Sequence, residues 1–272
     1  MDQGWIRLYG SYIKSRFRRG KFGSSLSDDA WYPEFCELAA SDDAVFATFR
    51  SEPRYREILE HVGTTLGGRY LQRVYQSTVP ESRLREICDT DAVGSPPLHA
   101  YPIVGPASPT TLRYLSVLAD LHSHFGPLDG WDVLEIGVGY GGQCRVASLI
   151  DQPRSWTLVD LPEVILLAQR FLRESGVSTQ AEAVSAFDTS GRSSDLLISN
   201  YAFSELRREV QEDYYYRFVS VARRGYVTFN SVTPKGFHSI SAKAFAQRVG
   251  GAVLPEKPRS YPGNKVVVWD HS

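Results

Sequence analysis

The sequence predicts an α/β protein with a doubly wound, Rossmann-like sheet that is preceded by a helical N-terminal module. From residue 131 onward, short runs rich in β-branched residues alternate with segments of helical periodicity. These runs are continuously apolar, which is typical of parallel strands covered on both faces. We therefore expect a mostly parallel sheet whose ligand site lies beyond the carboxyl ends of its strands.

Length and composition agree with this fold class and exclude several others. The 272 residues suffice for one such domain with an appended module, and 42% hydrophobic residues exclude wholesale disorder. A net charge of −1 gives no electrostatic case for a nucleic acid partner, and no apolar run approaches the ~18 residues of a membrane helix. The first residues lack the apolar region expected of a secretory signal, and the three cysteines are scattered singly. We expect a cytoplasmic protein with no integral membrane segment.

The chain divides into three regions. Residues 1–93 form the helical module, which we expect either to cover the ligand site or to mediate self-association into a homo-oligomer. Residues 94–130 begin with a stretch rich in proline and glycine, predicted as a lid loop, and continue into a helix over 110–125. Residues 131–272 form the ligand-binding domain. The helices predicted in the module cover 30–40, 42–51, 53–63 and 81–90.

The elements of the ligand-binding domain follow from its alternating pattern. The last two strand-like runs have no helix between them, which predicts a terminal antiparallel hairpin. The predicted strands cover 131–138, 155–161, 179–184, 195–200, 225–230, 252–258 and 265–270, and the predicted helices cover 141–150, 162–175, 203–223 and 241–249.

A glycine-rich stretch, VLEIGVGYGGQCRV at 133–146, joins the first predicted strand to its helix. Glycine permits a tight turn there and lets a ligand approach bare backbone amides. Gly137, Gly139 and Gly142 satisfy the dinucleotide pattern G-x-G-x-x-G. Asp160 stands near the distance expected of a ribose-binding acid. One interpretation is therefore a nicotinamide-dependent oxidoreductase.

The acid that precedes the glycines favours a different cofactor. Glu135 stands two residues before Gly137, at the carboxyl end of the predicted strand. A negative charge is unfavourable beside a pyrophosphate but suits the cationic ammonium and sulfonium groups of S-adenosylmethionine. The sheet also starts late in the chain and closes with a strand pair, an order that fits a methyltransferase better than two mononucleotide-binding halves.

The motifs and their order resemble the class I S-adenosylmethionine-dependent methyltransferases. EIGVGYGGQ at 135–143 is similar to their motif I, and LVDLP at 158–162 is similar to their second-strand acid motif. Together with DLLISNYAFSEL, GYVTFN and PGNKVVVW, the stretch from about 95 to 270 resembles a family of sugar O-methyltransferases from bacterial polysaccharide and glycoside pathways. The resemblance implies a methyltransferase sheet with an antiparallel last strand.

This resemblance also implies cofactor contacts, residue by residue. The acid and glycines of motif I would hold the methionine end, Asp160 would accept both ribose hydroxyls, and Leu161 would pack on the adenine. AVSAF at 183–187 lacks the acid that many members carry there, so Ser185 and backbone groups would contact the adenine instead. The residues expected to contact the cofactor are Glu135, Gly137, Gly139, Gly141, Asp160, Leu161, Ser185, Asn200 and Tyr201.

Methyl transfer to a hydroxyl requires positioning and a base that takes the hydroxyl proton. Glu205, in SNYAFSEL, is the first candidate; its alternative role is to support the first turn of a helix. His238, after the fifth strand, is the second, with a structural hydrogen bond as its alternative. We find no convincing trio of carboxylates near the strand ends and expect no metal.

Four further residues are candidates for contact with the acceptor, which we expect to be a nucleotide sugar, a lipid-linked glycan or a glycosylated natural product. Arg113 and Lys235 can grip a phosphate or carboxylate, or lie on ordinary surface. Tyr140 and Gln143 can contact the ligands, or cover the turn and cap backbone groups. A non-catalytic subunit that binds S-adenosylmethionine beside an active partner is the remaining alternative.

Overall fold

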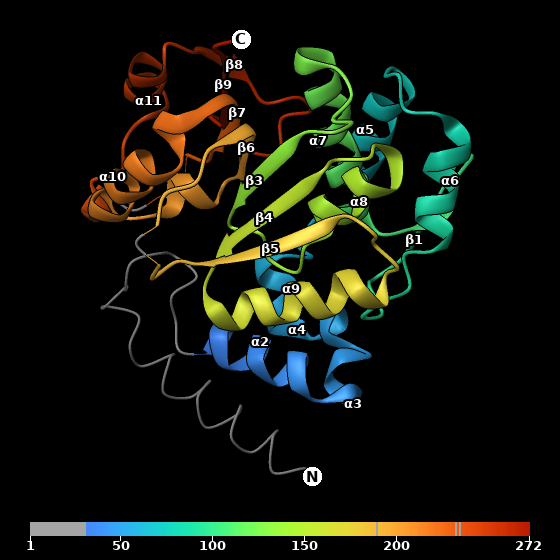
Figure 1. Ribbon diagram of the computed structural model, residues 1–272. Coiled ribbons are helices and arrows are strands. Elements are labelled where there is room, and N and C mark those ends of the chain that lie inside the picture. Colours follow the sequence, from blue (N-terminus) through green and yellow to red (C-terminus); the bar gives the residue numbers. More distant parts are fainter. Residues whose placement is uncertain (1–30, 189, 232, 234) are drawn as a thin grey trace.

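The computed structural model describes residues 31–188, 190–231, 233 and 235–272, so the first thirty residues of the predicted helical module lie outside the described residues (Figure 1). One seven-stranded sheet forms the centre, in the order β5-β4-β3-β6-β7-β9-β8. Its strands are β3 (Asp132–Ile136), β4 (Ser155–Asp160), β5 (Gln180–Ser185), β6 (Ser194–Asn200), β7 (Ala222–Phe229), β8 (Ala252–Pro255) and β9 (Lys265–Asp270).

The pairing of these strands confirms the predicted fold class. Strands β5, β4, β3, β6 and β7 are all parallel, whereas β9 is antiparallel to both of its neighbours, β7 and β8. The predicted terminal hairpin is therefore present, and β9 is inserted between β7 and β8. This is a doubly wound, Rossmann-like sheet, and it differs from the 3-2-1-4-5-6 sheet of dinucleotide-binding folds by its antiparallel β9.

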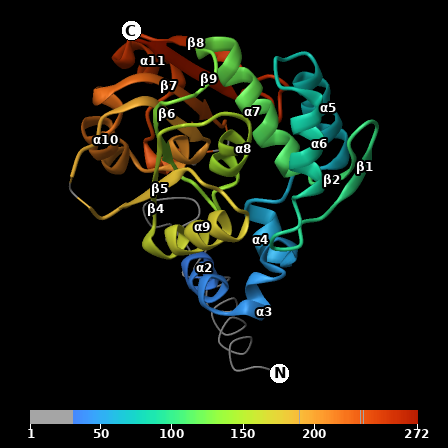
Figure 2. The same ribbon diagram turned by 45° about the vertical axis from the view of Figure 1, so that its right-hand side comes forward.

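Helices cover both faces of the sheet because its strands alternate their side chains between two apolar cores. Val133 belongs to the core beneath α7, α8 and α9, and its neighbour Leu134 belongs to the core beneath α10 and α11. Figures 1 and 2 show α10 and α11 on the opposite side of the sheet from α7 and α8. These helices are α7 (Pro109–Phe125), α8 (Gly142–Ile150), α9 (Pro162–Glu174), α10 (Arg208–Arg217) and α11 (Ala242–Val249).

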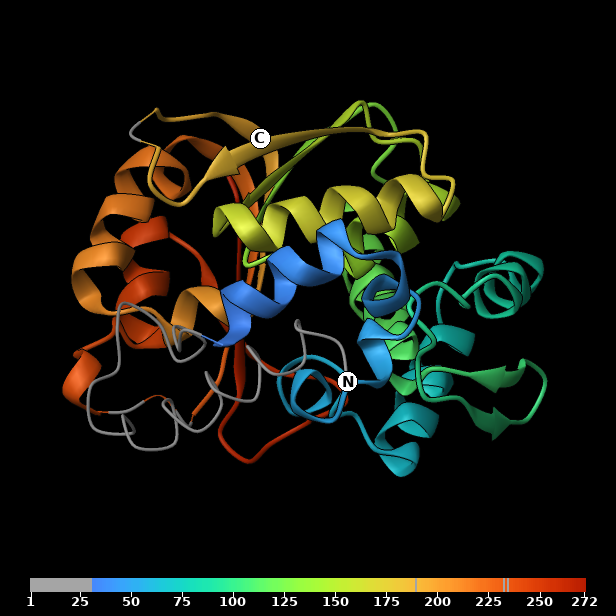
Figure 3. The same ribbon diagram turned by 90° about the horizontal axis from the view of Figure 1, so that it is seen from below.

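The N-terminal helices pack on this layer instead of forming a separate core. Seen from below, α2 lies along α9 (Figure 3), and α5 packs on α7. Helix α5 was not among the predicted helices because Gly67 and Gly68 lower its helical propensity. Gly67 is required by packing, since a Cβ there would lie 2.1 Å from the Tyr101 hydroxyl. The helices are α2 (Trp31–Ser41), α3 (Asp43–Phe46), α4 (Pro53–Ile58), α5 (Thr64–Tyr75) and α6 (Glu81–Asp89).

Several predicted elements differ from the structure. The helix predicted over 42–51 is divided into α3 and a short 3-10 helix (Phe49–Ser51), and the one predicted over 53–63 ends at Ile58. The stretch predicted as a lid loop contains a short antiparallel hairpin, β1 (His99–Tyr101) and β2 (Gly105–Ala107). The helix predicted over 203–223 was wrong in its extent: a 3-10 helix covers Ala202–Glu205, α10 runs from Arg208 to Arg217, and β7 begins at Ala222. The polar start of β7 lacks the apolar pattern of a buried strand. Arg223 is exposed, and the half-buried Arg224 pairs across the strands with Asp270 at 3.1 Å.

A buried ionic cluster joins the N-terminal helices to the sheet layer. Arg50 is fully buried, and its guanidinium contacts Glu60 at 2.5 Å and Asp91 at 2.7 Å. Arg145, on α8, approaches the same Asp91 at 3.8 Å. Each charge in such a cluster depends on the others, because water cannot replace a lost partner.

Removing the central cation tests this dependence. We expect Arg50→Met to lower the free energy of unfolding by about 3–5 kcal/mol, because two carboxylates lose their buried partner. Urea unfolding measures the change. Arg83→Ala is the matched control: Arg83 pairs with Glu86 on an exposed helix face, and its loss costs at most about 1 kcal/mol. Equal stability losses in the two variants would contradict the account.

Candidate functional site

The glycine turn lies between β3 and α8, at the carboxyl edge of the sheet. Gly137, Gly139 and Gly141 have φ angles of 77°, 53° and 86°, a region that favours glycine. A Cβ on Gly137 would lie 2.0 Å from the Cβ of Ala202, so the turn has no room for a side chain there. The predicted motif is thus folded into a tight turn that presents backbone to the strand ends.

Tyr140 holds the turn from the side of the N-terminal helices. Its ring is 1% exposed and packs against Phe171, Phe49 and Tyr114 at centroid distances of 4.8, 5.8 and 6.0 Å. The Arg50 guanidinium lies 4.8 Å from its centre. Tyr140, predicted as an acceptor contact with covering of the turn as its alternative, thus lies in the core and covers the turn.

Asp160 lies beside the glycine turn, as expected for a ribose-binding acid. It ends β4, and its carboxylate accepts from the backbone N–H of Gly139 at 3.4 Å and of Leu161 at 2.8 Å. Burial raises the pKa of Asp160 to about 6. Ser185 is paired with Asp160 in the sheet, at the end of β5, and its hydroxyl accepts from the N–H of Phe187 at 3.2 Å.

Glu135, predicted to contact the methionine end of the cofactor, is almost fully buried in the structure. Its side chain is 2% exposed, and its Oε2 accepts from the Trp156 indole at 3.0 Å. Burial raises the pKa of Glu135 to about 8, and the nearby Asp160 adds to the effect. The carboxyl group is therefore largely protonated at neutral pH, and a neighbouring cation would favour its ionised form.

The end of β6 brings three predicted residues together. Asn200 donates to Gln143 at 3.5 Å, and Gln143, which is fully buried, donates to the backbone carbonyl of Tyr114 at 3.3 Å. The Oδ1 of Asn200 is buried without a hydrogen-bond partner in the structure. Tyr201 follows with a φ of 72°, a conformation that costs energy for a bulky residue and is frequent at functional sites. Gln143 is therefore a bridge between α7, α8 and β6.

The two candidate bases occupy different environments. Glu205 is half-buried after β6, and its carboxylate accepts from the amide of Asn230, which follows β7. Burial raises the pKa of Glu205 to about 7. His238 and Lys235 are exposed, and the backbone carbonyl of His238 accepts from Arg208 at 2.8 Å. The structure thus joins Glu205 to the strand ends, whereas His238 and Lys235 face solvent.

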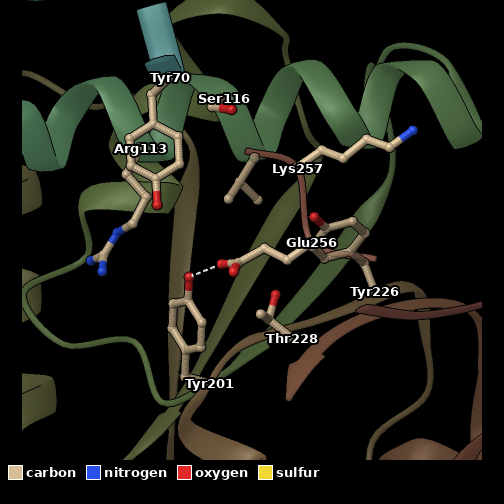
Figure 4. A pocket seen from close by; sticks show the side chains of 9 residues that line it. Tyr70, Arg113, Ser116, Tyr201, Tyr226, Thr228, Glu256 and Lys257 are labelled. Atoms are coloured by element: carbon tan, nitrogen blue, oxygen red, sulfur yellow. Dashed lines mark hydrogen bonds between the residues drawn. The ribbon is translucent and has the colours of Figure 1, made fainter. Parts of the chain in front are cut away.

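A small pocket lies beside the ends of β6 and β7 (Figure 4). Arg113, on α7, lines it together with Tyr201, and both were predicted from the sequence. Tyr70 and Glu256 also line it and were missed. Glu256 had one available signal, an acid between two prolines after a strand; Tyr70 had none, since it comes from the unpredicted α5. The full lining is Tyr70, Arg113, Ser116, Val117, Tyr201, Tyr226, Thr228, Glu256 and Lys257.

The part of the chain that the structure describes contains neither a candidate metal site nor a candidate membrane-spanning helix. No group of three or more His, Cys, Asp or Glu side chains there could hold a metal ion. None of the helices there is both long enough and apolar enough to span a bilayer.

Comparison with known proteins gives no family assignment: no family model and no curated protein matches the chain. Among solved structures, magnesium protoporphyrin IX methyltransferase (ChlM) from Synechocystis PCC 6803 with bound SAM is 15% identical, with a TM-score of 0.46 over 78% of this chain and 95% of that one. The 16S rRNA N2 G1207 methyltransferase (RsmC) of T. thermophilus is 16% identical, with a TM-score of 0.43 over 65% and 46%. MtNAS in complex with MTA and tNA is 15% identical, with a TM-score of 0.44 over 98% of both chains. These similarities concern the fold alone and identify no substrate.

The buried carboxyl group of Glu135 predicts a pH-dependent stability. Because its pKa in the folded protein lies above the ordinary value of about 4.3, folding favours the protonated form. Its contribution is complete below the unfolded pKa and is lost as the pH rises through about 8. Glu135→Gln mimics the protonated group, so we expect it to unfold like the wild type at pH 4 and to be more stable by several kcal/mol at pH 9. Urea unfolding at both values measures this, and parallel curves for the two proteins would contradict it.

Proposed function

We propose that the protein is an S-adenosylmethionine-dependent O-methyltransferase that methylates a sugar hydroxyl in the assembly of a bacterial glycan or a glycosylated natural product. The observation that carries the cofactor assignment is the position of the Asp160 carboxylate against the amide of Gly139 in the glycine turn. An acid in this place can accept both hydroxyls of a ribose, while the turn offers backbone to the methionine end.

The remaining groups of the site also fit this cofactor. When bound, S-adenosylmethionine supplies an electrophilic methyl group on a sulfonium. Glu135 would give up its proton beside that cation, because a nearby positive charge lowers the pKa of a buried acid. The unpartnered Oδ1 of Asn200 supplies an acceptor for the ammonium group or for the acceptor hydroxyl.

The strand order favours this proposal over a nicotinamide-dependent oxidoreductase. The antiparallel β9 stands where a dinucleotide-binding sheet would carry a sixth parallel strand. The enclosed acid of β3 also favours a cationic ligand over a pyrophosphate. A sugar as the acceptor is supported by the resemblance of the GYGGQC and ISNYAFSEL motifs, and nucleotide sugars, lipid-linked glycans and finished glycosides all fit it.

Glu205 is the base in this proposal. The new bond joins the acceptor oxygen to the methyl carbon, the bond between sulfur and that carbon breaks, and the hydroxyl proton passes to Glu205. Its carboxylate is held by Asn230, and its pKa of about 7 suits proton transfer at neutral pH. His238, in contrast, is exposed to solvent and is not held at the strand ends as Glu205 is.

Methyl-transfer rates test the role of Glu205. We expect kcat to rise with pH through about 7, because only ionised Glu205 accepts a proton. Glu205→Gln would lower turnover by about 10²–10⁴-fold and abolish this dependence, while the affinity for S-adenosylhomocysteine stays unchanged. His238→Gln is the matched variant and would retain activity.

The assay uses labelled S-adenosylmethionine with a panel of nucleotide sugars and glycosides, and with RNA and a porphyrin for comparison. Transfer to the sugars alone is the expected result. Transfer to RNA or porphyrin alone would contradict the sugar acceptor. Loss of turnover in His238→Gln, with full activity in Glu205→Gln, would contradict the choice of base.

A further inference from the structure

Arg113 is a buried cation that forms no ion pair with a carboxylate of the described residues. Its residue is 7% exposed, yet no carboxylate of the described residues lies within ion-pair distance, and its Nε has no hydrogen-bond partner in the structure. Arg50, equally removed from water, has two carboxylates. A buried charge without a counter-ion is costly, and an anionic group of a ligand would supply the missing partner.

The surroundings of Arg113 are aromatic instead of ionic. Its guanidinium carbon lies 5.2 Å from the ring centre of Tyr114 and 6.0 Å from that of Tyr201. The carboxylate that shares the pocket, Glu256, is already occupied: it accepts from the Tyr201 hydroxyl, from the N–H of Ser260 at 2.8 Å and from the Asn264 amide at 3.2 Å. Among the described residues, Glu256 is thus held by neutral donors and forms no ion pair with Arg113.

The start of α7 is fixed against the glycine turn, which brings Arg113 to the edge of the cofactor site. A Cβ on Gly142 would lie 2.3 Å from the ring of Tyr114, so this ring packs on the bare backbone of the turn. Gln143 also donates to the carbonyl of Tyr114 at 3.3 Å. Arg113 is the residue before this anchor, and Tyr201 brings the end of β6 to its other side.

We propose that the Arg113 guanidinium, flanked by the rings of Tyr114 and Tyr201, forms a buried binding site for a carboxylate or phosphate group. Figure 4 shows the Glu256 carboxylate beside the phenols of Tyr70 and Tyr201, the Arg113 guanidinium beyond these phenols, and the ammonium of Lys257 pointing away. A planar guanidinium binds such a group through two parallel hydrogen bonds, which an exposed point charge cannot do.

The anion has two sources if the proposed function holds. One is the methionine carboxylate of the cofactor, and the other is an acidic group on the acceptor, such as a uronate carboxylate or a sugar phosphate. Both present the same chemistry to Arg113. Binding measurements on the full chain separate them, because S-adenosylhomocysteine carries the carboxylate and 5′-methylthioadenosine lacks it.

Calorimetric titrations of the wild type, Arg113→Met and Lys257→Met test the site. If it holds the cofactor carboxylate, Arg113→Met weakens S-adenosylhomocysteine by at least about tenfold and leaves 5′-methylthioadenosine unchanged. If it holds the acceptor anion, both affinities stay unchanged, and inorganic phosphate raises the Tm of wild type but not of Arg113→Met, at equal ionic strength. Lys257→Met, the matched control, behaves as wild type in every titration.

Two results distinguish failure of the anion site at Arg113 from failure of the proposed function. If neither S-adenosylhomocysteine affinity nor the effect of phosphate changes in Arg113→Met, the anion site is overturned. If S-adenosylhomocysteine does not bind the wild type, the proposed function fails, while the phosphate comparison still decides whether the site exists. Thermal unfolding without ligand shows whether the variant is folded. We expect the Tm of Arg113→Met to equal or exceed that of wild type, because the substitution removes an unpaired buried charge. A lower Tm would assign Arg113 a structural role.

Discussion

The packing of Tyr140 beneath the Arg50 cluster is the constraint on which the rest of the structure depends. Tyr140 belongs to the glycine turn, yet its ring lies among side chains of the N-terminal helices, α7 and α9. Arg50 covers the ring and draws Glu60 and Asp91 to the same point. The turn is thus fixed from outside the sheet, and the N-terminal helices are part of the site's support.

This enclosure also determines the electrostatics of the site. Desolvation raises the pKa values of Glu135, Asp160 and Glu205, all of which lie at or near the carboxyl ends of β3, β4 and β6. Acidic side chains with raised pKa values at one edge of a sheet are typical of a site that binds a cation or accepts a proton. Arg113, on the neighbouring α7, adds a buried positive charge that forms no ion pair with the described carboxylates.

Sequence patterns predicted the sheet because continuous apolar runs and tight glycine turns are local signals. The glycine turn and Asp160 came together as expected, since parallel strands end at one edge. Other features depend on contacts between distant segments and have no local signal. Gly67 disfavours a helix but makes room for Tyr101. Arg223 falls in the predicted helix but lies in β7. The buried Glu256 accepts from Tyr201, 55 residues earlier.

The central claim is that this turn holds an adenosyl cofactor with a cationic centre. Calorimetric titration of the full chain with S-adenosylhomocysteine, beside NAD, tests it most directly, with Asp160→Asn as the control variant. The account predicts that S-adenosylhomocysteine binds the wild type, that Asp160→Asn weakens this binding because the ribose loses a charged acceptor, and that NAD does not bind. Binding of NAD with no binding of S-adenosylhomocysteine would contradict it.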